Sequence, residues 1–460
     1  MENFFKLKEN GSDVKKEVIG GITTFLTMAY IIVVNPDILS VTGMDKGALV
    51  TVTCITAAFA TIFMGLYANL PFALASGMGL NAYFAFTVCN PKGMNIPWEM
   101  ALTAIFIEGL IFILLSLTRA REAVANCIPK NLKLAVTAGI GLFIAFIGFV
   151  NAGIVVSNEA TKVSKGDLTS PTVIIAVIGI LVIIICEIKK IRGGILLGIL
   201  ASTLIAWGYA FISPESAASH MIFAPNGIFK FASMKPIAFK LQIQHILDAD
   251  KIGKFIVVVF SFLFVDFFDT LGTLVGVASK VDMVDNEGKV KNAGKALLVD
   301  AVGTTVGAVL GTSTVTTFVE SSAGVAQGAR TGLASVVTGA LFLVAMFFSP
   351  LFISIPSCAT APALIIVGIF MMQNVVNIDF NDLTEGVPAF LTIALMPLTY
   401  SIGDGLTLGI LSYGIINGIY NIMRRTKGQE RKNVSSIVYI LSIVFILNII
   451  APSILSKFFK

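Results

Sequence analysis

Acidic residues inside long apolar stretches are the side chains of this 460-residue sequence best suited to chemistry. Asp266 and Asp269 stand three residues apart in the run FLFVDFFDTLGT, so on a helix both carboxyls project from one face. Two acids on one apolar face repel each other and are desolvated, which favours protonation of at least one of them. The pair predicts a site that handles cations. The competing interpretation is that one aspartate only hydrogen-bonds unwound backbone of a neighbouring segment.

A third acid, Glu320, follows a run from Thr312 to Val319 that is rich in β-branched and hydroxyl residues and precedes a run of small residues. β-Branched residues favour extended backbone, so this stretch predicts a short strand followed by a half-helix, with Glu320 near mid-membrane. Burying a carboxylate at that depth is costly, and a functional role is therefore the default interpretation.

An earlier segment has the same form. Residues 71–75 are predicted to be extended, and the following Ser76-Gly77-Met78-Gly79-Leu80-Asn81 leads into a helix. The two glycines suit a tight, unwound turn. The alternative is that Gly77 and Gly79 serve close helix packing, while Asn81 forms an interhelical hydrogen bond.

The other polar residues give weaker evidence of a functional role. Glu108 stands alone in an apolar span, where it is either a packing residue or a member of a proton path, while Glu187 and Asp300 lie near predicted span ends and are expected to be solvated. His220 and His245 have no metal-ligand spacing, and the five cysteines include no CxxC pair. Motifs for ATP hydrolysis, metalloprotease or nucleophile-elbow chemistry do not occur, so we predict no catalytic residues and no bound metal.

Composition identifies the elements that must position these residues. Hydrophobic residues make up 56% of the chain and charged residues only 13%, about half the share of a soluble protein. Apolar stretches long enough to span a bilayer recur throughout. They lie near 18–35, 48–67, 71–88, 100–117, 132–150, 171–188 and 194–212, and again near 253–278, 296–310, 312–329, 332–348, 358–373, 385–401 and 405–423. A further run at 436–455 has no counterpart in the first half.

The fold class predicted is an all-α polytopic membrane protein of about 14 transmembrane segments, arranged as two inverted seven-span repeats. Lysine and arginine concentrate in alternate loops, which places the N-terminus in the cytoplasm. Because each half has an odd number of spans, the second half enters the membrane from the opposite side and is inverted relative to the first. Ile128-Pro129 and Gly141 recur at one sequence offset as Ile355-Pro356 and Gly368. The basic clusters are explained as topology signals, so no nucleic-acid partner is expected.

Three runs together resemble a known family: ASGMGLNA at 75–82, FVDFFDTLGT at 264–273 and TTFVESSAGV at 316–325. They are similar to motifs of the nucleobase/cation symporter family, which includes uracil and xanthine permeases, in its azaguanine-type branch of hypoxanthine, guanine and adenine permeases. Uracil permeases carry a histidine in the corresponding part of the eighth span. Its absence here favours the purine branch.

The resemblance implies a plasma-membrane importer of purine nucleobases that works by proton symport with elevator-type alternating access, with Na⁺ as the alternative coupling ion and no other cofactor. It implies base contacts from Asp266, Glu320 and Asn81, and proton coupling through Asp269. The full candidate substrate-binding set is Asp266, Glu320, Asn81, Gly79, Phe318, Val319 and Ser321.

The family's fold implies a core domain (1–120 and 253–350) that moves against a gate domain (121–252 and 351–460), in a homodimer surrounded by membrane lipid. Two other functions are weighed. Xanthine, uracil or anion transport on the same fold is one, and the embedded acids argue against an anion site. A membrane enzyme is the other, and it would need metal-binding acids or histidines at the membrane surface.

Overall fold

The computed structural model describes residues 2–91, 93–117, 129–245, 255–256, 258–263, 265–266, 270, 292–426, 430, 432–436, 438–440, 442–443 and 445–446. Within these residues, nine helices are long and apolar enough to cross a membrane. They are Val14–Ser40, Lys46–Ala68, Trp98–Leu117, Lys130–Ala152, Pro171–Ile188, Gly194–Ile212, Ala293–Leu310, Ser357–Asn377 and Ile402–Thr426. The chain is a mostly helical, multi-pass membrane protein. Most of the predicted span near 253–278, including Asp269, lies outside the described residues.

The first span is longer than the sequence predicts and is interrupted near its middle. It consists of α2 (Val14–Met28) and α3 (Ile31–Ser40). At the junction the backbone tightens, because the N–H groups of Ile32 and Val33 bond to carbonyls three residues back. This irregular turn contains Tyr30, which is buried.

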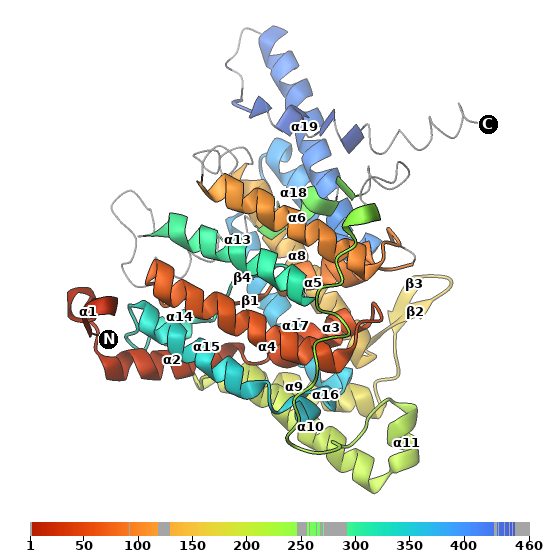
Figure 1. Cartoon of the computed structure of the whole chain (residues 1–460). Coiled ribbons are helices and arrows are strands. Elements are labelled where there is room, and N and C mark those ends of the chain that lie inside the picture. The colour runs from red at the N-terminus through yellow and green to blue at the C-terminus, as the bar shows by residue number, and fades with distance from the viewer. Residues whose placement is uncertain are drawn as a thin grey trace.

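α2 lies beside α15 (Gly332–Ala345), which also packs against α4 (Lys46–Phe63) (Figure 1). Glu17 of α2 caps the start of α15, since its carboxylate accepts hydrogen bonds from the backbone N–H groups of Thr331, at 3.1 Å, and Ala334, at 3.2 Å. This buried acid therefore has a structural role.

A second packed pair consists of α8 (Lys130–Ala152) and α17 (Ser357–Met372). Gly141 and Gly368, which the sequence pairs by their common offset, face each other across this contact. A Cβ atom on Gly141 would lie 2.7 Å from the carbonyl oxygen of Gly368, and the reverse distance is 2.5 Å. Only glycine permits so close an approach of two helices.

The other long helices are α6 (Trp98–Leu117), α9 (Pro171–Ile188), α10 (Gly194–Ile212), α13 (Ala293–Leu310), α18 (Leu383–Thr399) and α19 (Ile402–Thr426). α6 packs against α13, α9 against α10, and α18 against α19. A hairpin of β2 (Val155–Asn158) and β3 (Lys162–Lys165) joins α8 to α9, which the sequence did not predict. The hairpin and α11 (Pro214–Ser219) lie away from the N-terminus in Figure 1.

Short elements complete the described chain. They are α1 (Glu2–Phe5), α16 (Ser349–Ile353), 3-10 turns at Lys8–Asn10, Ile243–His245 and Gln373–Asn377, and π-helical turns at Met64–Ala68 and Tyr83–Val88. In the apolar run at 436–455, Ser442 contacts α19, because its hydroxyl donates to the carbonyl of Ile410 at 3.3 Å.

Candidate functional site

Two broken spans meet at the centre of the molecule. β1 (Leu74–Ser76) leads into α5 (Met78–Ala82), and β4 (Val315–Thr317) leads into α14 (Ser321–Val325). The two strands pair antiparallel and lie between the surrounding helices (Figure 1). The strand and half-helix predicted for each span are therefore confirmed.

The ladder continues beyond the strands themselves. The N–H of Gly77 donates to the carbonyl of Thr314 at 3.0 Å, and the N–H of Phe318 donates to the carbonyl of Ala73 at 2.9 Å. Ser321 ties the start of α14 to the other span, because its hydroxyl accepts a hydrogen bond from the N–H of Ala73 at 2.9 Å.

The outer edge of each strand is satisfied by a threonine from a neighbouring helix. Thr61 of α4 uses its hydroxyl to bond both the N–H (2.9 Å) and the carbonyl (3.0 Å) of Leu74. Thr304 of α13 does the same for Val315, at 3.1 and 3.0 Å. Extended backbone can lie inside a membrane only where its polar groups are paired, so these two hydroxyls make the broken spans possible.

Glu320 lies at the junction between β4 and α14. Its carboxylate accepts a hydrogen bond from the hydroxyl of Tyr30 at 2.5 Å, and the ring of Tyr30 lies 6.5 Å from that of Phe318. Val319 is 49% exposed and Glu320 is half-buried, so this side of the junction is accessible. Tyr30 was not singled out in the sequence, because neither glycine nor proline marks the interruption of its span.

Asn81 lies on the opposite broken span and is fully buried. Its Oδ1 accepts a hydrogen bond from Ser76 at 3.2 Å, while its Nδ2 has no partner within the described part of the chain. Ser76 in turn shares a hydrogen bond with Thr312 at 3.0 Å, and Asn35 of α3 donates to Thr312 at 3.1 Å. The polar network thus fixes the amide and leaves a donor available.

Three buried carboxyls form a separate cluster beside β4. Glu108 of α6 interacts with both Asp266 and Asp300. The hydroxyl of Thr270 donates to Asp300 at 2.8 Å and shares a second hydrogen bond of 2.8 Å with Thr316 of β4. Thr270 therefore connects this acidic cluster to the β4 strand.

The structure corrects the expectation for Asp300. The sequence places it near a span end, in solvent, whereas it is completely buried. The helix α13 begins at Ala293, so Asp300 lies about two turns inside it, where α6 covers it. Glu187, by contrast, is exposed as expected.

The other predicted site residues make structural contacts. A Cβ atom on Gly79 would lie 2.5 Å from the side chain of Ile140 in α8, and one on Gly77 would lie 2.7 Å from the methyl group of Thr316. Both glycines therefore permit close packing in this structure, as the alternative interpretation predicts. The structure brings Glu320, Phe318, Val319 and Ser321 together on one broken span and Gly79 and Asn81 on the other.

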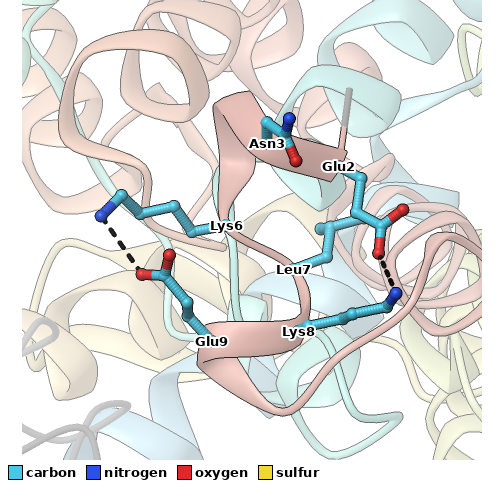
Figure 2. Close-up of a pocket in the computed structure, with 6 residues that line it drawn as sticks. All are labelled: Glu2, Asn3, Lys6, Leu7, Lys8 and Glu9. Carbon is cyan, nitrogen blue, oxygen red and sulfur yellow. Dashed lines mark ion pairs between the residues drawn. The ribbon is translucent and has the colours of Figure 1, made fainter.

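A hollow of about 240 Å³ lies elsewhere, on the N-terminal segment (Figure 2). Ion pairs Lys6–Glu9 at 3.2 Å and Lys8–Glu2 at 2.9 Å cross it, and all four side chains are exposed. Exposed ion pairs of this kind contribute little energy. The hollow is unrelated to the broken spans.

Comparison with solved structures establishes the fold. The transmembrane domain of the cyanobacterial bicarbonate transporter BicA superposes with a TM-score of 0.65 at 14% identity, over 85% of this chain and 97% of that one. The murine anion transporter Slc26a9 in its inward-facing state superposes with a TM-score of 0.59 at 11% identity, over 88% of this chain and 68% of that one. At these identities the likeness concerns the fold alone.

Sequence comparison identifies the family. The chain is 41% identical to the adenine permease AdeP of Escherichia coli, over 98% of this chain and 96% of the relative. It is 43% identical to the guanine/hypoxanthine permease PbuG of Bacillus subtilis, over 97% and 99%. The model of the permease family Xan_ur_permease matches residues 15–406. This chain therefore belongs to the xanthine/uracil-type permease family and is a membrane transporter, not an enzyme.

Proposed function

We propose that the protein imports purine nucleobases of the guanine, hypoxanthine and adenine class by proton symport. The observation that carries the proposal is the identity of over 40%, across nearly the whole chain, to permeases named for adenine and for guanine and hypoxanthine. The half-buried Glu320 carboxylate at the start of the second half-helix adds a chemical reason, because purine rings present N–H donors.

Each polar group of the site has a role in this proposal. Glu320 accepts hydrogen bonds from the base at the start of α14, and Asp266, from the acidic cluster beside β4, is the second proposed acceptor. Charged acceptors form strong bonds of this kind. Asn81 donates from Nδ2 to a ring nitrogen or carbonyl oxygen. Phe318 supplies an apolar surface for the ring. Tyr30 holds the Glu320 carboxylate in place and thereby fixes the direction in which it meets the substrate.

Gly79, Val319 and Ser321 complete the proposed substrate-binding set through their backbone and position at the two junctions. Asp269 remains the proposed proton-coupling residue and lies outside the described residues.

The proposed architecture is two inverted seven-span repeats. Three pairs of features support it: β1 with β4, Thr61 with Thr304, and Gly141 with Gly368. In each pair one member comes from each half and makes the same kind of contact. We assign 1–120 and 253–350 to a core domain that carries the site and moves as an elevator against a gate domain of 121–252 and 351–460, in a homodimer with the N-terminus in the cytoplasm.

Anion transport is the second candidate, because two solved structures that share the fold are a bicarbonate transporter and an anion transporter. The buried carboxyls Glu108, Asp266 and Asp300 disfavour it, since an anion site needs positive potential.

Uptake of a radiolabelled purine into proteoliposomes tests the proposal. Unlabelled guanine, hypoxanthine, adenine, xanthine, uracil and bicarbonate are added as competitors, and pH and Na⁺ gradients are imposed separately. We expect purine uptake that an inward proton gradient drives. Uptake that responds only to Na⁺ would contradict proton coupling, and competition by bicarbonate without competition by purines would overturn the substrate class.

A further inference from the structure

A buried carboxylate joins two helices that the proposed function assigns to different domains. Asp37 of α3 is 9% exposed. Its Oδ1 accepts a hydrogen bond from the hydroxyl of Ser357 at 3.1 Å, and its Oδ2 accepts one from the hydroxyl of Thr360 at 2.9 Å. Both hydroxyls belong to α17.

The Asp37 carboxylate also forms an ion pair with a lysine of the helix that follows α3 in the chain. The ammonium group of Lys46, at the start of α4, lies 3.1 Å from Oδ1 of Asp37. Lys46 is on the chain segment that follows α3, so the ion pair lies entirely on one side of the contact. The two hydroxyl bonds are the part of the network that crosses to α17.

The position on α17 adds to the interaction. Ser357 is the first residue of this 16-residue helix and Thr360 lies in its first turn. The positive end of the helix dipole therefore faces the Asp37 carboxylate. Two directed hydrogen bonds and a favourable dipole make this a specific contact between the helices.

We propose that Asp37, Ser357 and Thr360 form a latch that closes the transporter on the membrane face where α3 ends. The proposal rests on the proposed elevator function, in which α3 moves with the core domain and α17 stays with the gate domain. Hydrogen bonds fail beyond displacements of a few tenths of an ångström, so any sliding of α3 along α17 breaks the latch. Its release is a required step of the transport cycle.

The first test needs no substrate. Deuterium uptake at backbone amides of 31–40 and 357–372 is compared among the wild type, Asp37→Asn and the double variant Ser357→Ala/Thr360→Val. Ser40→Ala is the matched control, because among the described residues the Ser40 hydroxyl bonds only to the backbone carbonyl of Asp37 in the same helix. We expect several-fold faster exchange in both segments for the two latch variants. Wild-type exchange in both would overturn the latch.

The second test locks the contact. Cysteines replace Asp37 and Ser357 in a background without native cysteines, and the protein is oxidised in proteoliposomes. Cross-linking should stop purine exchange across the membrane and reductant should restore it, while each single-cysteine variant is unaffected by oxidant. Full exchange by the cross-linked protein would overturn the latch. Absence of purine exchange by the wild-type protein in the same proteoliposomes would instead contradict the proposed function, and the deuterium measurement would still decide the latch.

Discussion

The two broken spans share a construction but differ in charge. Each has a three-residue strand, a five-residue α-helix and a threonine hydroxyl that satisfies the strand edge. The first presents the neutral amide of Asn81, whereas the second presents the carboxylate of Glu320, held by Tyr30. The shared features build the scaffold. In the proposed function, the difference between the halves supplies the chemistry, because only the second broken span carries a charge for the substrate.

The largest effect on purine transport is expected at Asp266 and Asp269, two acids of the second half. Asp266→Asn should weaken purine binding and exchange together by about 1.5–3 kcal/mol, since a charge-assisted hydrogen bond is lost. Asp269→Asn should bind and exchange purine but fail to accumulate it against a gradient. Binding, counterflow and pH-driven uptake are compared for both variants. Equal losses in all three would mean that the acids act as one coupled unit.

The structural equivalence of the halves can be tested at the two threonines. Thr61→Val and Thr304→Val each leave a buried strand N–H and carbonyl without a hydrogen-bond partner. Each substitution should lower the free energy of unfolding by about 1–3 kcal/mol. Both variants should lower the melting temperature of the detergent-solubilised protein by similar amounts. Thr305→Val is a suitable control, because within the part of the chain that the structure describes the Thr305 hydroxyl bonds only to the carbonyl of Ala301 in its own helix. A loss in one variant alone would contradict the equivalence.

Tyr30→Phe tests whether the orientation of the Glu320 carboxylate matters in addition to its charge. The variant keeps the carboxylate and removes the hydrogen bond that orients it, so purine affinity should fall by about 1 kcal/mol, roughly fivefold, with the protein folded. The measurement is a binding titration across guanine, hypoxanthine and adenine. Unchanged affinity for all three would remove Tyr30 from the site.

The smallest effect is expected at an ion pair remote from both broken spans. Lys432 bonds Asp382 at 2.6 Å and Glu385 at 2.9 Å at the start of α18. The hydrogen bond from Lys432 lowers the pKa of Asp382 below its usual 3.8. The stability it contributes is therefore present above pH 3.8 and is lost as the pH falls through the lowered value.

Lys432→Ala should remove only about 0–1 kcal/mol at neutral pH, because the side chains are partly exposed. The variant should also reduce the loss of stability on acidification. Thermal melts of the variant and the wild type across an acid pH series check this. An effect larger than that of Thr304→Val would show that charge outside the broken spans matters more than our account allows.

Much of this fold follows from local sequence. The spans at 171–188 and 194–212 coincide with α9 and α10, because proline or glycine begins each helix and polar residues end it. The broken spans follow from β-branched and glycine residues. The contact of Tyr30 with Glu320 could not be predicted, since 290 residues separate the two and the interruption in α2–α3 has no local signal. The burial of Asp300 likewise depends on the packing of α6 and α13.

The most direct test of the asymmetric site compares Glu320→Gln with Asn81→Ala. Binding of guanine, hypoxanthine and adenine to the purified, folded variants is measured beside the wild type and the exposed control Glu187→Gln. Glu320→Gln should lose binding of all three purines, whereas Asn81→Ala should alter their ranking more than their maximal transport rate. Wild-type purine affinity in Glu320→Gln would contradict the assignment of charge recognition to the second half. So would an Asn81→Ala variant that binds all three purines more weakly but in the same order of affinity.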